Sequence, residues 1–147
     1  MKSEKLGVCV IGAGRAGLIH AVNFAKGIKN ARLTAIVDPN RETAEQACCE
    51  LELDLYYQDY RQALDDDQVD AVVIVTPTDY HRDIVVAAAD AGKHILCEKP
   101  MAMTVAECDE MIAAAENNNV VLQIGFMRRF DQSFVYAREQ VRQGAIG

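Results

Sequence analysis

The sequence predicts an α/β fold, namely a doubly wound parallel sheet of six strands in a single domain. Three observations carry this prediction. Apolar runs alternate with segments of helical period from one end of the chain to the other. The four longest apolar runs are near-continuous in Val, Ile, Leu, Ala and Cys, as in strands that are covered on both faces. A glycine-rich turn joins the first run to a helical segment, which is typical of the Rossmann fold.

The strands are expected in the spatial order 3-2-1-4-5-6, the usual order when helices connect successive parallel strands. In chain order, the runs that predict them are Leu6–Ile11, Arg32–Asp38, Leu55–Tyr57, Ala71–Thr76, His94–Glu98 and Val120–Gly125. In such a sheet ligands bind at the carboxyl ends of the strands, near the point where the order reverses. The loops after these strands are therefore the places to look for function.

The helices between the strands carry recognisable start and stop signals. Pro39-Asn40 opens the helix after the second strand, and Thr78 is expected to cap the helix after the fourth. Thr104 and Glu107 form a capping box for the next helix. The expected buried stripes of these last two helices are Ile84, Val85, Ala88 and Ala91 before Gly92, and Cys108, Met111, Ile112 and Ala115. A final amphipathic helix carries Phe134, Arg138 and Val141, with Asp131 as its cap.

Composition excludes several classes of protein. The 147 residues suit one domain, 1–147, with 1–5 as an N-terminal extension. The net charge of −7 argues against a nucleic-acid partner, and no apolar run approaches the ~20 residues of a membrane span. The start of the chain leaves no room for a signal peptide, so we expect a cytoplasmic protein. Five cysteines without a CxxC spacing indicate reduced thiols, with Cys9 and Cys97 as small core residues, and no metal site is expected.

The glycine turn predicts a dinucleotide site. Gly12 allows a sharp turn off the strand, Gly14 leaves room for a pyrophosphate, and Gly17 lets the helix pack closely on the sheet. The pyrophosphate is expected over residues 12–16, that is Gly12, Ala13, Gly14, Arg15 and Ala16, at the positive end of the helix. Asp38 lies 21 residues after Gly17, where a carboxylate can accept hydrogen bonds from the adenosine ribose. The alternative is a strand-to-helix turn that binds nothing.

Asp38 also favours NAD over NADP, because its carboxylate repels a 2′-phosphate. Arg41, three residues later, leaves NADP tolerance open, since a guanidinium there could bind the phosphate or stack on the adenine. A solvated arginine on the helix surface is the favoured interpretation of Arg41.

Polar residues follow the fourth and fifth strands. Thr76, Pro77 and Thr78 turn the chain off the sheet and offer hydroxyls at the ligand-facing edge. His81, in the next helical turn, is more often a structural group than a catalyst at such a position.

After the fifth strand come Glu98, Lys99 and Pro100. An ammonium or amine beside the nicotinamide can stabilise a developing alkoxide or relay its proton. On residue types alone, however, a solvated lysine in a loop is a better interpretation of Lys99 than a catalytic lysine. We expect this turn to allow a cis peptide bond between Lys99 and Pro100.

The motifs GAGRAG, IVDPN, TPTDYH, CEKP and GFMRRFD together resemble the Gfo/Idh/MocA oxidoreductase family, in order and at the family's spacing. The resemblance implies an N-terminal Rossmann domain followed by a C-terminal α/β domain that carries much of the substrate pocket and the oligomer contact. It implies that Lys99 matches the catalytic lysine of the EKP motif. The cofactor-binding set that we expect is Gly12, Ala13, Gly14, Arg15, Ala16, Asp38, Arg41, Thr76, Pro77, Thr78, His81 and Glu98.

The segment GFMRRFD is most similar to the inositol 2-dehydrogenases of this family, so Lys99, Met127 and Arg128 are the expected substrate-binding residues. The arginines could equally pair with surface carboxylates. Thr78 stands where the family's TP motif usually continues with Asn, which puts a contact from that side chain in doubt.

Family enzymes are about twice as long, and their second domain supplies an aspartate and a histidine. The resemblance therefore implies that residues 144–147 begin the boundary to such a domain, and that this chain alone binds NAD but turns over little. The expected function is hydride transfer between NAD and a secondary alcohol of a polyol or sugar, with myo-inositol as the best candidate, in a homo-oligomeric full-length protein. The alternatives are a non-catalytic dinucleotide sensor and a family member with sugar-modifying chemistry that uses tightly bound NAD.

Overall fold

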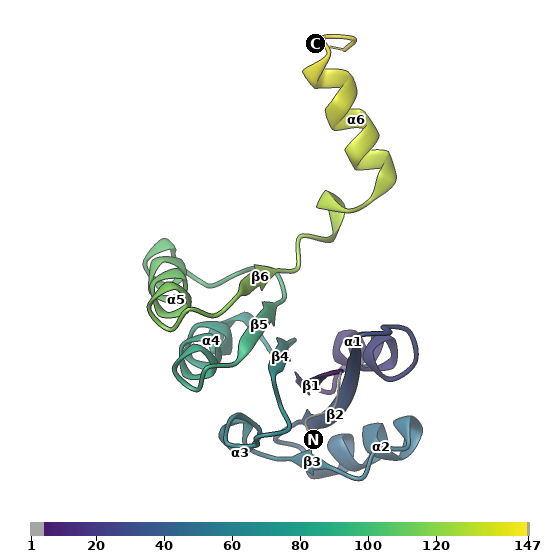
Figure 1. Cartoon of the computed structure of the whole chain (residues 1–147), viewed down its shortest axis with the longest axis vertical. Helices are drawn as coiled ribbons and strands as arrows, with labels where there is room; N and C mark the ends of the chain where they lie inside the picture. Colours follow the sequence, from purple (N-terminus) through teal and green to yellow (C-terminus); the bar gives the residue numbers. More distant parts are fainter. Residues whose placement is uncertain (1–4, 147) are drawn as a thin grey trace.

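The computed structural model describes residues 5–146, and every structural statement below concerns these residues. At its centre lies one six-stranded sheet in the order β3-β2-β1-β4-β5-β6, with every pair parallel, so the predicted topology is confirmed (Figure 1). The strands are β1 (Leu6–Ile11), β2 (Ala31–Val37), β3 (Tyr56–Tyr57), β4 (Ala71–Ile74), β5 (His94–Cys97) and β6 (Leu122–Ile124). The helices are α1 (Arg15–Lys26), α2 (Arg41–Leu51), α3 (Tyr60–Leu64), α4 (His81–Asp90), α5 (Val105–Asn117) and α6 (Gln132–Arg142), with short 3₁₀ turns η1 (Thr78–Tyr80) and η2 (Met127–Arg129).

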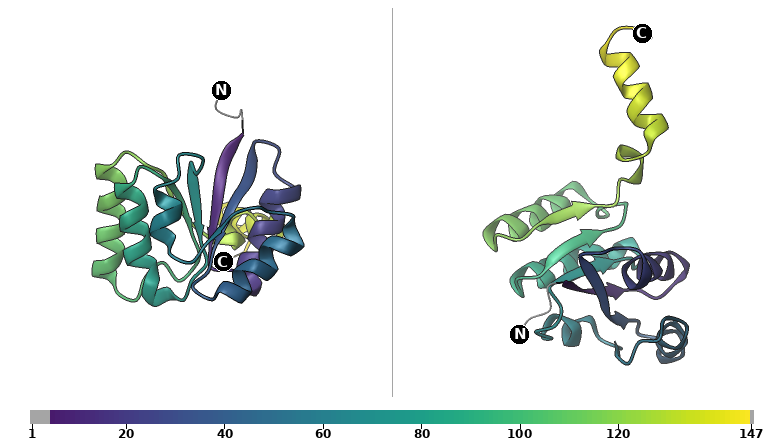
Figure 2. Two further views of the ribbon diagram at one scale, coloured as in Figure 1. Left: turned by 90° about the horizontal axis from the view of Figure 1, so that it is seen from below. Right: turned by 45° about the vertical axis from the view of Figure 1, so that its right-hand side comes forward.

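Two helical layers cover the sheet. Helices α1 and α2 lie on one face, and α3, α4 and α5 lie on the other, as Figures 1 and 2 show. Each layer forms its own apolar core, one around Val10, Ala21 and Ile36 and the other around Ile74, Val85 and Met111. Because both faces of the central strands are buried, those strands are apolar at nearly every position, which is the pattern that the sequence shows. Cys9 and Cys97 are completely buried, as expected of small core residues.

Four strands end one or two residues earlier than predicted. Asp38, Thr76, Glu98 and Gly125 each lie past the last residue of their strand, although the amides of Asp38, Glu98 and Gly125 still donate to the neighbouring strand. The physical reason is that the chain turns off the sheet at these positions, so their polar groups face the loops at the carboxyl edge. Strand β6 also begins late, at Leu122, because it has a neighbour on one side only.

Most predicted helix caps are present. Asn40 Oδ1 accepts from the Thr43 amide at 3.2 Å, Asp131 accepts from two amides at the start of α6, and the Thr104–Glu107 capping box forms. The prediction that Thr78 caps α4 is wrong. Thr78 begins the 3₁₀ turn η1, in which the Tyr80 amide donates to the Pro77 carbonyl at 3.0 Å, so no side-chain cap is needed there.

Two members of the predicted apolar stripes are exposed. Ala91 lies just past the end of α4, and Ile112 is 44 % exposed on the outer side of α5. Helix α6 departs most from a compact arrangement, since it extends away from the sheet and buries none of its residues (Figures 1 and 2). Of the helices within residues 5–146, none has the length and apolar character required to span a membrane.

Candidate active site

The loops that follow β1, β2, β4, β5 and β6 meet at one edge of the sheet. The structure shows this through direct contacts between them. The Asp38 carboxylate accepts from the Ala13 amide at 2.9 Å, and a Cβ on Gly12 would lie 2.8 Å from the Val75 carbonyl oxygen. A Cβ on Gly125 would lie 3.0 Å from the Glu98 carboxylate. The sequence thus placed its candidate residues at a common edge, as the topology requires.

The glycine loop has the close approaches that its sequence predicts. Gly12 has φ of +102°, a conformation that side chains disfavour. A Cβ on Gly17 would lie only 1.8 Å from the Gly12 carbonyl oxygen, so α1 can rest on the loop only with glycine at this position. Gly14 differs from both, because nothing lies within 4 Å of the place where its Cβ would be. The space above Gly14 is therefore open to a ligand.

The N-terminus of α1 has no side-chain cap and no acidic residue in its first turn. By contrast, at the N-termini of α2, α3, α5 and α6 a capping side chain accepts a hydrogen bond from a backbone amide. The amides of Gly14, Arg15 and Ala16 have no acceptor among residues 5–146. Uncapped donors at a positive helix end are the arrangement that binds a phosphate group.

Not all of the predicted loop amides are free. The Gly12 amide donates to the Val37 carbonyl at 2.8 Å, and the Ala13 amide donates to Asp38. These two residues therefore shape the loop, whereas the next three present donors to a ligand.

Asp38 lies at the end of β2 and uses each carboxylate oxygen once. Oδ2 accepts from the Ala13 amide, and Oδ1 accepts from the Asn40 amide, both at 2.9 Å. A carboxylate offers about four acceptor positions, so two of them remain for the hydroxyls of a ribose. The two backbone bonds fix the direction in which those remaining positions point.

Arg41 lies on the outer surface of α2 and pairs within its own helix. Its Nε donates to Glu45 Oε1 at 2.8 Å, and Glu45 also accepts from the Tyr56 hydroxyl at 2.7 Å. The bond to Glu45 raises the pKa of Arg41, and the bond from Arg41 lowers the pKa of Glu45. With 68 % of its side chain exposed, Arg41 matches the solvated helix-surface interpretation.

The loop after β4 contains Thr76, Pro77 and Thr78 at the expected edge. The Thr76 hydroxyl is buried and has no hydrogen-bond partner among the described residues. His81, which we expected to contact the cofactor, lies behind this loop and is 1 % exposed. Its Nδ1 faces the Pro100 carbonyl oxygen and its Nε2 faces the Thr76 carbonyl oxygen, both at 2.9 Å. Both ring nitrogens thus face backbone carbonyls, which favours the structural role of His81, and contact with a cofactor stays a prediction.

Lys99 follows Glu98 at the end of β5, before a cis bond to Pro100. Its side chain is exposed, and within residues 5–146 its ammonium makes no hydrogen bond or ion pair. The Glu98 carboxylate does not reach that ammonium. Instead, its Oε2 accepts from the Lys99 amide at 3.1 Å, and its Oε1 contacts His20 Nε2 at 2.9 Å. His20, on α1, is a site residue that the sequence reasoning missed.

Lys99 shares an open pocket of about 570 Å³ with the segment after β6. Its lining residues are Lys99, Gly125, Phe126, Met127, Arg128 and Arg129. The predicted catalytic lysine and both predicted substrate residues therefore line one space. Arg128 stacks over the Phe134 ring at 4.6 Å, and neither Arg128 nor Arg129 forms an ion pair with a described residue. The alternative in which these arginines pair with surface carboxylates is not what the described residues show.

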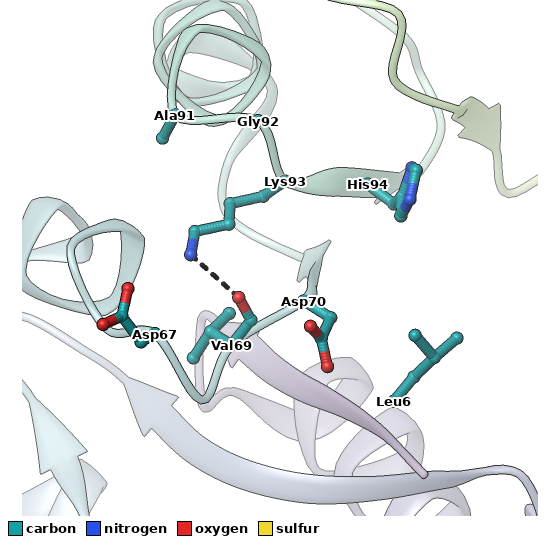
Figure 3. A pocket seen from close by; sticks show the side chains of 8 residues that line it. All are labelled: Leu6, Asp67, Val69, Asp70, Ala91, Gly92, Lys93 and His94. Carbon is teal, nitrogen blue, oxygen red and sulfur yellow. Dashed lines mark hydrogen bonds between the residues drawn. The ribbon is translucent and has the colours of Figure 1, made fainter. Parts of the chain in front are cut away.

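A second pocket, of about 330 Å³, lies at the opposite edge of the sheet, where β4 and β5 begin (Figure 3). Its single lysine, Lys93, already donates to the carbonyls of Asp66 and Val69 at 3.0 and 2.8 Å. Lys93 thus closes the loop before β4. Within residues 5–146, no three histidine, cysteine, aspartate or glutamate side chains come together as metal ligands.

Comparison with known proteins supports a dinucleotide site. The model of an oxidoreductase family described as having an NAD-binding Rossmann fold matches residues 6–126. The chain is 38 % identical over 138 residues to scyllo-inositol 2-dehydrogenase (NAD(+)) of Bacillus subtilis, covering 94 % of this chain and 40 % of that protein. It is 40 % identical over 138 residues to myo-inositol 2-dehydrogenase of Thermotoga maritima, covering 94 % and 41 %.

A crystal structure of scyllo-inositol dehydrogenase from Lactobacillus casei, with bound NAD(H) and scyllo-inositol, superposes with a TM-score of 0.91 at 34 % identity. The match covers 97 % of this chain and 42 % of that chain. The present chain thus spans about two fifths of the length of the curated relatives that it matches.

Proposed function

Because the chain belongs to the Gfo/Idh/MocA oxidoreductase family as its NAD-binding Rossmann domain, we propose that it is the cofactor-binding half of a polyol dehydrogenase. The observation that carries this proposal is the single pocket shared by Lys99, Met127 and Arg128 at the edge where the dinucleotide loop ends. The matched relatives are more than twice as long as this chain, and we propose that a further domain would supply the remaining wall of this pocket.

The residues present fit NAD. Uncapped amides at Gly14, Arg15 and Ala16, with open space above Gly14, would hold the diphosphate. The two unused acceptor positions of Asp38 would hold the adenosine ribose. Thr76, Pro77, Thr78 and Glu98 would line the other half of the site. When bound, NAD supplies the acceptor for a hydride from the substrate carbon.

Lys99 is proposed to act on the substrate hydroxyl. An alcohol that loses a hydride must also lose its hydroxyl proton, and negative charge develops on that oxygen. The Lys99 ammonium, which no described carboxylate neutralises, would stabilise that charge or pass the proton on. The Glu98 carboxylate points back towards α1, so it leaves the charge of Lys99 available to the substrate.

Met127 and Arg128 would position the polyol. A guanidinium presents several fixed donors that suit neighbouring hydroxyls, and the ring of Phe134 restricts the plane of Arg128. Since the matched relatives include myo- and scyllo-inositol dehydrogenases, we propose an inositol as the substrate, with myo-inositol first.

The test is oxidation of myo-inositol with NAD by the complete protein, compared with Lys99→Ala. Loss of Lys99 should lower kcat at least about a hundredfold, the usual contribution of a positioned acid or base. Lys29→Ala is the matched control, because Lys29 is an exposed lysine in the turn before β2. Undiminished turnover by Lys99→Ala would remove this lysine from the mechanism. NADH binding without oxidation of any inositol or sugar would favour a sensor.

A further inference from the structure

Two histidines hold the backbone on either side of Lys99. On one side, His20 contacts the Glu98 carboxylate at 2.9 Å, and that carboxylate accepts from the Lys99 amide at 3.1 Å. On the other side, His81 contacts the carbonyl oxygen of Pro100 at 2.9 Å. No described residue forms a hydrogen bond or ion pair with the ammonium of Lys99, so the hydrogen bonds among these residues restrain Lys99 through its backbone alone.

The His20 contact depends on three elements of the fold. His20 comes from α1, Glu98 from the end of β5, and Gly125 from the end of β6. Any side chain at Gly125 would meet the Glu98 carboxylate at about 3.0 Å, so glycine makes room for it. The His20 and Glu98 side chains are only 24 % and 25 % exposed. Partial burial strengthens such a contact, because water competes less for it.

The His81 contact joins two loops of the site. Its ring bridges the carbonyl of Thr76, after β4, and the carbonyl of Pro100, after β5. A neutral ring donates one of these bonds, and a doubly protonated ring donates both. With only 1 % of the residue exposed, this bridge is shielded from solvent.

We propose that His20 and His81 are positioning residues that set the location of Lys99, His20 through the Glu98 carboxylate and His81 through the Pro100 carbonyl. The catalytic part of this inference rests on the proposed function, because Lys99 must act on substrate for its position to matter. The geometric part, that the histidines order the Lys99 backbone, stands on the contacts alone.

Amide exchange tests the geometric part on this chain without any reaction. In His20→Leu, the Lys99 amide should exchange with solvent deuterium about fivefold faster, as expected when its acceptor is no longer fixed. His20→Gln, whose amide can still donate to Glu98, should keep exchange near wild type. Wild type, His20→Leu and His20→Gln should bind ADP-ribose, which has no nicotinamide, with equal affinity. Equal affinity would show that the dinucleotide loop is intact in both variants. Unchanged exchange in His20→Leu would overturn the proposal, whatever result Lys99→Ala gives.

A double-mutant cycle in the complete protein tests the catalytic part. His20→Leu should lower kcat about tenfold with little change in KM for NAD, while His20→Gln should lose less than about twofold. In the Lys99→Ala background, His20→Leu should have no further effect, because it acts through a lysine that is gone. The same fold-loss in both backgrounds would show that His20 acts independently, and would overturn the proposal.

His81→Leu extends the test, and His81→Gln, which keeps a donor, is its conservative counterpart. His81→Leu should raise exchange at Lys99 and His81→Gln should raise it less, and the effect of His81→Leu on kcat should likewise vanish in the Lys99→Ala background. If Lys99→Ala itself turns over normally, the proposed function of Lys99 fails, and the exchange measurements still decide whether the histidines hold its backbone.

Discussion

Asp38 uses one carboxylate for two tasks, since it binds the backbone of the glycine loop and faces the expected ribose. Asp38→Ser should therefore weaken NADH binding and shift the NADPH-to-NADH affinity ratio towards NADPH by at least about tenfold. The measurement is titration of each reduced dinucleotide by its fluorescence. Glu42→Gln, an exposed acid in the first turn of α2, removes the same charge elsewhere and should leave the ratio unchanged. An unaltered ratio in Asp38→Ser would contradict this role.

The cysteines differ sharply in their environment. Burial, with a smaller contribution from Glu98, raises the pKa of the Cys97 thiol to about 12, and burial also raises the pKa of Cys9. A raised pKa keeps a thiol protonated at pH 8, so little of the reactive thiolate forms at Cys9 or Cys97. Exposed Cys49 should thus react with a disulfide reagent in the native protein, whereas Cys9 and Cys97 should react only after unfolding. Cys49→Ser should remove the fastest phase and leave only slower labelling of half-exposed Cys108, and fast labelling of Cys97 would contradict the structure.

At the residue scale, spacing along the chain predicted where the candidate residues after each strand would lie. Asp38 and Lys99 follow strands, and their place at the carboxyl edge follows from the topology alone. His20 was missed because its partner Glu98 is 78 residues away, and a histidine inside an amphipathic helix gives no local signal. The burial of His81 was equally hidden, since it depends on where the Pro100 carbonyl lies in space.

Two glycines of the strand-to-helix turn should respond differently to the same substitution. In Gly17→Ala, the new methyl group would lie 1.8 Å from a backbone oxygen, so α1 must shift, at a cost of about 2 to 4 kcal/mol of unfolding free energy. In Gly14→Ala, the methyl group enters open space, so stability should change by less than about 1 kcal/mol. NADH affinity should nevertheless fall at least about tenfold, because that space is where the diphosphate approaches.

Chemical denaturation and NADH titration of both variants provide the measurement. Each variant serves as the control for the other, since the same methyl group is added three residues apart. Normal NADH affinity in Gly14→Ala would mean that the dinucleotide lies elsewhere.

Whole elements were predictable where burial on both sides makes a strand apolar throughout. Strands β1, β2, β4 and β5 and their order follow from that pattern. The late start of β6 and the absence of a Thr78 cap could not be predicted from that pattern. Each depends on which neighbouring group forms a hydrogen bond with the backbone amides and carbonyls. In η1 that neighbour is the Pro77 carbonyl, a choice that the residue type of Thr78 does not reveal.

At the scale of the whole molecule, the main feature is helix α6, which exposes large apolar side chains to solvent. Tyr136 is 66 % exposed and Val141 is 57 % exposed on a helix with no buried residue. Exposed apolar surface of this kind favours association, so the chain should form concentration-dependent oligomers. The double variant Tyr136→Ser/Val141→Ser should shift the population towards monomer in size-exclusion chromatography with light scattering.

Glu139→Ser is the matched control, because it changes an exposed polar residue of the same helix. If the unmodified chain is a monomer at every concentration, or if the control has the same effect as the double variant, apolar contact through α6 is excluded. Amphipathic spacing predicted this helix correctly, but not that its apolar side would lack a partner, since that depends on tertiary placement.

The two outermost strands are very short: β3 has two residues and β6 has three. An edge strand normally has a row of unpaired backbone N–H and C=O groups with which a strand of another polypeptide can pair. Here the edge strands offer few such groups, which disfavours extension of the sheet by a further strand even though its interior is rich in β-branched residues.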